Sequence, residues 1–154
     1  MNQQQLVTRF YTAFQQLDYK TMQSCYSSNA VFSDPVFGLL EGEEVGAMWQ
    51  MLCSNAKNFS LQFFNLQTLD EEYATCEWVA NYTFSASGRP VVNKVKAHMR
   101  IQNGLIIEHT DAFNLWRWSR QALGLPGILL GWSQFMQGRI HRKAKQQLTR
   151  FMGG

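Results

Sequence analysis

An imidazole and a carboxylate stand two residues apart in the segment 105–115, at His109 and Asp111. The segment follows an Asn103-Gly104 pair and has the composition of a β-strand. Alternate residues of a strand share a face, so both groups fall on the face that carries most of the apolar residues. An ionised carboxylate there costs several kcal/mol unless it is paired or hydrogen-bonded. The sequence therefore predicts either a structural pair or acid–base chemistry in a pocket.

Asp111 is the first candidate for a general acid or base, and His109 is its candidate assistant because histidine titrates near neutral pH. Their Cβ atoms should lie ~6–7 Å apart along the strand, so we expect Asp111 to find its partner on another element. Asp34, which precedes Pro35, is the second catalytic candidate. Its alternative role is to end a strand by accepting hydrogen bonds from nearby backbone N–H groups.

Several other chemistries have little support in the sequence. The His, Cys and Asp residues lack metal-ligand spacing, so we expect no metal, and nothing indicates an organic cofactor. There is no Gly-x-Ser-x-Gly nucleophile elbow and no glycine-rich phosphate loop. Apolar side chains could line a pocket around the carboxylates, although such residues more often form plain core. The candidates for ligand contact are Phe10, Phe14, Trp49, Trp78 and Phe113.

The elements that must position these residues follow from hydrophobic periodicity. Helical spacing predicts helices over 3–16, from an N-cap at Asp18 to about residue 26, and over 43–55. A short strand is expected at 30–33. Four longer strands are expected at 59–69, 75–85, 91–102 and 105–115. Asn103-Gly104 is a strong hairpin signal, and the short connections predict an antiparallel sheet with the helices over one face.

The C-terminal part of the chain has a composition of its own. Residues 1–111 hold 7 Lys and Arg against 11 Asp and Glu, whereas residues 112–154 hold 7 Lys and Arg and no acid. Helical spacing over 128–152 predicts an amphipathic basic helix. We expect it to pack on its own domain or a partner. Contact with a membrane surface is possible but not favoured, and no nucleic acid is expected because the basic part lacks interleaved aromatics.

The composition gives expectations for the size of the core and for the cellular compartment. At 154 residues and 45% hydrophobic content it is long enough for one well-buried core. Three cysteines without close spacing are expected to be reduced and buried, which favours a cytoplasmic location. The N-terminus has no signal-peptide pattern, and no stretch reaches the ~18–20 apolar residues of a membrane span.

The order of these motifs is similar to a known family. The segment 34–38, the helix bearing Met48-Trp49 and the strand ending in Asp111-Ala112-Phe113 together resemble the nuclear-transport-factor-2-like superfamily, in its SnoaL-like polyketide cyclase and ketosteroid isomerase branch. The resemblance covers roughly residues 3–118. It implies a cone-shaped α+β fold with a deep apolar pocket, which is usually dimeric through the outer sheet face. The superfamily includes isomerases, cyclases, hydrolases and proteins that only bind.

The resemblance also implies roles for particular residues. Asp34 corresponds to the general base of ketosteroid isomerase, and Asp111 to the acid/base carboxylate of SnoaL-like cyclases and to one carboxylate of limonene-epoxide-hydrolase-like enzymes. Phe10 and Ala97 stand where ketosteroid isomerase has its oxyanion donors. Neither can donate a hydrogen bond from its side chain, which argues against steroid-type isomerisation. Both become candidates for apolar contact with a ligand.

These observations predict an α+β cone at 1–118 and a helical extension at 119–154. Two functions fit the sequence. One is a cytoplasmic homodimer that binds a small apolar molecule, as a cofactor-independent isomerase, cyclase or hydrolase. The alternative is a non-catalytic ligand-binding or scaffolding protein whose basic helix contacts a partner or a membrane surface. A cavity containing both Asp34 and Asp111 would favour the first.

Overall fold

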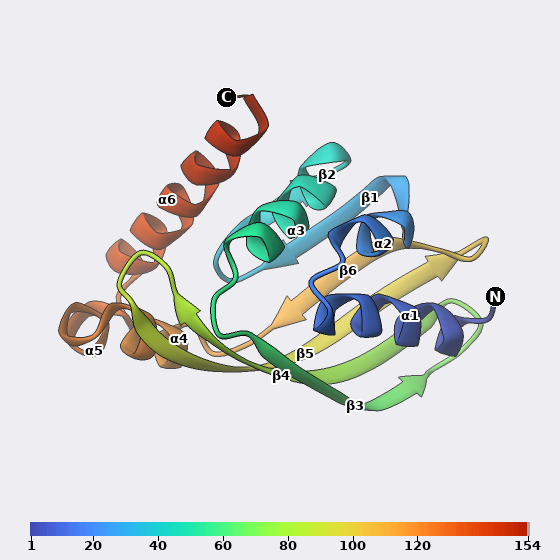
Figure 1. Ribbon diagram of the computed structural model, residues 1–154, viewed down its shortest axis with the longest axis horizontal. Helices are drawn as coiled ribbons and strands as arrows, with labels where there is room; N and C mark the ends of the chain where they lie inside the picture. Colours follow the sequence, from blue (N-terminus) through green and yellow to red (C-terminus); the bar gives the residue numbers. More distant parts are fainter. Residues whose placement is uncertain (154) are drawn as a thin grey trace.

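A curved six-stranded sheet and the helices over one of its faces make up the fold (Figure 1). The computed structural model describes residues 1–153. The helices are α1 (Gln3–Gln15), α2 (Tyr19–Ser24), α3 (Glu43–Asn55), α4 (Leu115–Leu123), α5 (Leu125–Leu130) and α6 (Gln134–Gly153). The strands are β1 (Tyr26–Asp34), β2 (Gly38–Glu41), β3 (Ser60–Thr68), β4 (Tyr73–Phe84), β5 (Arg89–Gln102) and β6 (Leu105–Ala112). The expected α+β class is confirmed.

Local signals start the N-terminal helices where the sequence predicts. The Asn2 side chain accepts from the backbone N–H of Gln5, and the Gln5 side chain accepts from that of Asn2, which forms a capping box. Asp18 caps α2 by accepting from the backbone N–H of Thr21. The turn between β5 and β6 has positive φ at both Asn103 and Gly104, as a type I′ hairpin requires.

The sheet is mixed rather than wholly antiparallel. Its strand order is β2-β1-β6-β5-β4-β3, and β1 runs parallel to β6, while the other recorded pairings are antiparallel. β1 also begins at Tyr26, earlier than expected, because its first residue already pairs with Ile106. The two strands lie more than 70 residues apart in the sequence, so no short connection reveals their direction.

A β-bulge changes which residues of β6 face inward. Arg100 pairs with Glu108 and Ile101 with Ile106, so Ile107 is an extra residue in β6. Ile106 is consequently buried and Ile107 only partly buried, which corrects the simple alternation expected over this strand. Beyond the bulge, His109 and Asp111 keep the inward position that the sequence predicts.

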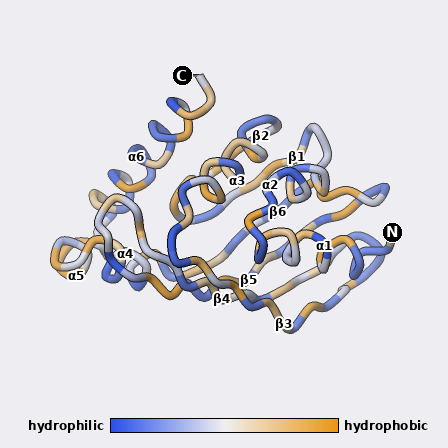
Figure 2. The backbone as a smooth tube through the Cα atoms, in the orientation of Figure 1, coloured by the Kyte–Doolittle hydropathy of each residue, from blue (hydrophilic) through white to orange (hydrophobic). Residues whose placement is uncertain are grey.

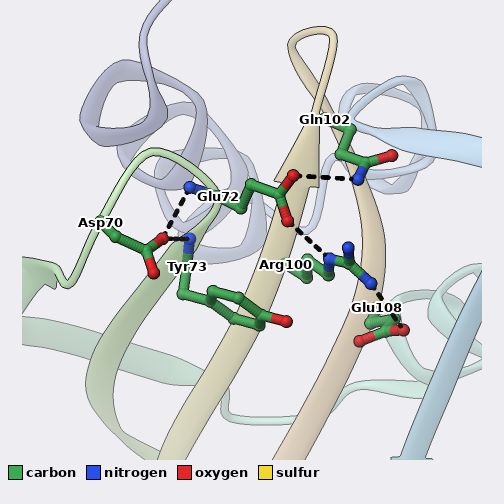
Figure 3. Close-up of polar contacts among 6 residues, drawn as sticks. All are labelled: Asp70, Glu72, Tyr73, Arg100, Gln102 and Glu108. Atoms are coloured by element: carbon green, nitrogen blue, oxygen red, sulfur yellow. Dashed lines mark hydrogen bonds and ion pairs between the residues drawn. The ribbon is translucent and has the colours of Figure 1, made fainter.

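The two faces of the sheet differ in polarity. The inward face packs against apolar side chains of α1, namely Leu6, Val7, Phe10, Tyr11 and Phe14. On the outward face, Arg100 lies 2.9 Å from Glu72 and 3.7 Å from Glu108 (Figure 3). Ion pairs at such a surface contribute little to stability.

The C-terminal segment forms three helices. Asn114 caps α4 by accepting from the backbone N–H of Arg117, so β6 stops before the predicted residue 115. The single helix expected over 128–152 is broken after Leu130, and Ser133 caps the first turn of α6 through the backbone N–H of Met136. Helix α6 contacts α3, and its Ala144 and Leu148 are buried in the main core.

Candidate active site

Asp34 ends β1, and within residues 1–153 its hydrogen bonds are made by one carboxylate oxygen. Its Oδ1 accepts from the backbone N–H groups of Val36 at 2.9 Å and Phe37 at 2.6 Å, as the turn-forming role predicts. Burial, together with the charge of Asp111 and against the lowering effect of the backbone bonds and of His109, raises the pKa of Asp34 to about 7. At neutral pH this carboxyl is therefore a proton donor as well as an acceptor.

His109 and Asp111 are hydrogen-bonded to each other, contrary to the expectation from their spacing. His109 Nε2 lies 2.8 Å from Asp111 Oδ1, with both side chains almost fully buried. Strand side chains lean along the strand, and the length of the imidazole spans the gap that the Cβ separation suggests. We expected a partner for Asp111 from another element. Such a partner, Tyr26, contacts His109 instead: its hydroxyl lies 2.6 Å from His109 Nδ1.

This chain of contacts fixes the protonation of the imidazole. Trp49 Nε1 donates to the Tyr26 oxygen at 2.9 Å, and an indole can only donate. The hydroxyl proton of Tyr26 is therefore left for His109 Nδ1, which accepts it. The ring proton then lies on Nε2 and is donated to Asp111. The hydrogen-bond pattern thus assigns the tautomer in which His109 Nε2–H donates to Asp111 Oδ1.

The two aspartates lie on neighbouring strands at the same level of the sheet. Ser33 of β1 pairs with Thr110 of β6 in parallel register, and each aspartate is the next residue of its strand. The influence of Asp111 on the pKa of Asp34 reflects the same proximity. Two carboxyl groups are thus brought together: Asp34 has a raised pKa, and Asp111 is hydrogen-bonded to His109. Environments that differ in this way set up an acid and a base.

Both aspartates line a cavity of about 630 Å³. This volume suits a small organic molecule. Four of the predicted contact residues also line it: Phe14, Trp49, Trp78 and Phe113. His109, Phe10 and Ala97 do not. These three side chains are buried; Phe10 and Ala97 belong to the hydrophobic core, and His109 is hydrogen-bonded to Asp111.

Several residues of the site were missed in the sequence. Asn93 is a buried polar residue of the lining, and its place in the inward alternation of Val91, Val95 and Ala97 could have revealed it. Tyr26 has no comparable local signal, because its role depends on the parallel pairing of β1 with β6.

Tyr11 of α1 is another buried residue near the site. Its side chain is fully buried, and its hydroxyl has no hydrogen-bond partner among residues 1–153. Burial raises the pKa of Tyr11 well above its ordinary value, and the charge of Asp111 adds to the shift. A neutral phenol therefore lies in the surroundings of Asp111 without contributing to the cavity lining.

The mouth of the cavity carries charge opposite to its floor. Helix α6 contributes Lys143, Gln147 and Arg150 to the lining, together with apolar residues. Within residues 1–153, no carboxylate lies at ion-pair distance from Lys143 or Arg150. An apolar chamber with an acidic floor and a basic entrance results.

Nucleophilic and metal chemistry find little support in the described chain. Burial raises the pKa of both Cys53 and Cys76 to about 11, which leaves little thiolate at neutral pH. Residues 1–153 hold no group of three His, Cys, Asp or Glu side chains placed to bind a metal ion. Nor does this part of the chain contain a helix long and apolar enough to cross a membrane.

Solved structures with the same fold come from several bacteria. A hypothetical protein of Catenulispora acidiphila with a ketosteroid isomerase-like fold, in complex with trimethylamine, matches with a TM-score of 0.69 and 15% identity over 83% of this chain and 98% of its own. A protein proposed to be a polyketide cyclase, from Xanthomonas campestris pv. campestris, matches with a TM-score of 0.65 and 20% identity. The match covers 77% of this chain and 95% of that protein. An LEH-like epoxide hydrolase of M. tuberculosis matches with a TM-score of 0.65 and 16% identity. The match covers 81% of this chain and 92% of that protein. At such identities the likeness establishes the fold alone.

Sequence comparison places the chain more specifically. A search of curated protein sequences found no match. The family model of the SnoaL-like domain, however, matches residues 7–109, which span both the first helix and the strand that carries His109. This match covers about two thirds of the chain and agrees with the fold of the solved structures. The protein belongs to the SnoaL-like domain family.

Proposed function

We propose that the protein binds a small apolar molecule in this cavity and moves a proton on it, with Asp111 as general base and Asp34 as general acid. The reaction class is isomerisation, cyclisation or hydrolysis without a metal or organic cofactor. The observation that carries the proposal is one apolar cavity lined by two carboxyl groups in different surroundings: burial raises the pKa of Asp34, and Asp111 is hydrogen-bonded to His109. Solved structures of this fold include an epoxide hydrolase and a protein proposed to be a cyclase, which supports the choice of class.

A bound ketone illustrates the proton transfer. The free oxygen of Asp111 takes a proton from the carbon beside the carbonyl, and the electrons of that C–H bond form the C=C bond of an enol. Asp34 gives its proton to the carbonyl oxygen as the C=O bond becomes single. Asp111 ends neutral and Asp34 ends ionised, and the reverse transfers regenerate both. General acid–base help of this kind contributes about 10²–10⁴-fold.

The surroundings limit how strong this catalysis can be. Phe10 and Ala97 provide no side-chain donor for an oxyanion, and in this proposal Asp34 protonates the carbonyl oxygen. His109 is a positioning residue, because it holds Asp111 and does not reach the cavity lining.

Proton exchange provides a direct test without knowledge of the natural substrate. A panel of cyclic ketones in D₂O is followed by ¹H NMR for loss of the protons beside the carbonyl, and binding is measured separately by thermal shift. We expect exchange with the wild type, at least about 10²-fold slower exchange with Asp111→Asn, and a smaller loss with Asp34→Asn. Both variants should still bind the ketone.

The control is Asp70→Asn. Asp70 Oδ1 accepts from the backbone N–H groups of Glu72 and Tyr73, the same pattern as at Asp34, but on an exposed turn (Figure 3). It should leave exchange unchanged. If ketones bind tightly and the Asp111→Asn variant exchanges their protons as fast as the wild type, the catalytic proposal is wrong and a binding function replaces it.

We also propose a cytoplasmic homodimer joined through the outward face of the sheet. The buried, free cysteines of the described chain support a reducing compartment. The resemblance to dimeric members of the superfamily supports the dimer.

A further inference from the structure

The segment from α5 into the start of α6 exposes an unusual number of large apolar side chains. Trp132 and Phe135 are each 68% exposed and Leu125 is 65% exposed. We call this surface the α5 patch; it consists of Leu125, Ile128, Leu129, Leu130, Trp132 and Phe135. Helix α5 lies at the end of the molecule far from the N-terminus, in a hydrophobic stretch of the chain (Figures 1 and 2). Large exposed apolar patches are typical of protein–protein and membrane interaction sites.

The exposure follows from how α5 packs on α4. A Cβ on Gly127 would lie 2.0 Å from the backbone oxygen of Ser119, and one on Gly131 would lie 2.1 Å from the Ser119 hydroxyl oxygen. The glycines therefore face inward against α4, and the large residues between and beside them face solvent. Leucine, isoleucine and phenylalanine more usually face the core. The close packing holds the apolar residues outward.

Basic residues flank the α5 patch in the sequence. Arg117 precedes it in α4, and Arg139 and Arg142 follow it in α6, all with exposed side chains. Residues 112–154 contain no Asp or Glu, so the segment has no acidic side chain of its own to neutralise them. Tryptophan, phenylalanine and leucine beside basic residues are the composition of segments that lie in the interface of an anionic bilayer.

We propose that the α5 patch docks the protein on the surface of an anionic lipid bilayer. Its apolar side chains enter the boundary between headgroups and acyl chains, while the arginines contact lipid phosphates. A second copy fits less well, because a symmetric contact would place two all-basic segments against each other. The docking is separate from the proposed catalysis, since no residue of the α5 patch lines the cavity.

Vesicle co-sedimentation tests the proposal with the full chain. We expect binding to phosphatidylcholine vesicles that contain about a third phosphatidylglycerol, and at least about tenfold weaker binding to phosphatidylcholine alone or at high salt. Trp132 fluorescence should shift to the blue on binding, and the shift should disappear in Trp132→Phe, which keeps an apolar side chain at that position.

Matched variants separate the α5 patch from general hydrophobicity. Leu129→Ser with Phe135→Ser should weaken vesicle binding by about tenfold or more, whereas Phe64→Ser with Leu69→Ser changes the same residue types at exposed sites on and after β3 and should not. Arg139→Gln with Arg142→Gln should reduce the dependence on salt. Circular dichroism checks that each variant is folded.

Two outcomes would overturn the proposal. One is equal sedimentation of the wild type with and without anionic vesicles. The other is a wild type that is oligomeric by light scattering and becomes monomeric in Leu129→Ser with Phe135→Ser, because the α5 patch would then be covered by protein. Ketone exchange by these variants reports on the proposed function separately, so either idea can fail without the other.

Discussion

At the scale of single residues, the site depends on how its two carboxyl groups are held. Asp34 is tied to the backbone by one oxygen and Asp111 to His109 by one oxygen, which leaves one oxygen of each for a ligand. Burial raises the pKa of Asp34, whereas Asp111 is hydrogen-bonded to a histidine that Tyr26 and Trp49 orient. In the proposed mechanism the same residue type serves two roles because its surroundings differ.

The raised pKa of Asp34 predicts a pH dependence of stability. The unfolded chain ionises Asp34 near pH 4, but the folded chain retains the proton until about pH 7. The contribution of Asp34 to the free energy of unfolding should therefore be largest below pH 4 and fall as the pH rises to 7. We expect a fall on the order of 1–4 kcal/mol in the wild type that is absent in Asp34→Asn, measured by urea unfolding.

Asp70→Asn is again the control, and it should leave this fall in place. Asparagine keeps the oxygen that accepts both backbone bonds at Asp34, so the comparison isolates the charge. Wild type and Asp34→Asn curves of equal slope between pH 4 and 8 would show that Asp34 ionises normally in the folded chain.

At the scale of the elements, close packing of α5 on α4 depends on the absence of a side chain at Gly127. Gly127→Ala should reduce the free energy of unfolding by about 1–3 kcal/mol, because backbone must move to admit the methyl group. Gly138→Ala in α6 meets only the end of the Arg142 side chain at 3.5 Å. It should instead stabilise the protein by about 0.5–1 kcal/mol through its higher helix propensity. Denaturant unfolding of both variants measures the contrast, and equal effects would contradict the packing seen between α4 and α5.

Elements defined by neighbouring residues could be predicted, and those defined by distant ones could not. Caps at Asn2 and Asp18 and the Asn103 turn place their elements from local chemistry. The parallel pairing of β1 with β6 and the bulge at Ile107 depend on contacts between remote segments. The site follows the same division: Asp34 and Asp111 were predictable as polar residues among apolar ones, but the contact of Tyr26 with His109 required the three-dimensional pairing.

At the scale of the whole molecule, charge is divided between the floor and the mouth of the cavity. Asp34 and Asp111 lie on the sheet, while Lys143 and Arg150 come from α6, the last helix of the chain. Helix α6 therefore completes the chamber and also gives its entrance a positive field, which attracts anions before they reach the apolar interior.

This field predicts a preference for apolar ligands that carry an anionic end. An aryl or cyclic ketone with a carboxylate should bind about 2–10-fold more tightly at low salt than its neutral methyl ester. Lys143→Gln with Arg150→Gln should remove the preference. Lys20→Gln with Lys94→Gln removes the same charge from α2 and from β5 and should retain it. Isothermal titration at two salt concentrations makes the comparison; a preference that survives in the first variant would locate its source elsewhere.

The backbone bonds of Asp34 have a consequence for how related sequences are interpreted. An aspartate at this position ends β1 whether or not the protein is an enzyme, so selection for folding alone would keep it through evolution. Asp111 bonds no backbone group, and its recorded hydrogen bond is to His109. Across descendants of a common ancestor, joint loss of Asp111 and His109 with Asp34 retained would mark lineages that kept the scaffold and abandoned the chemistry.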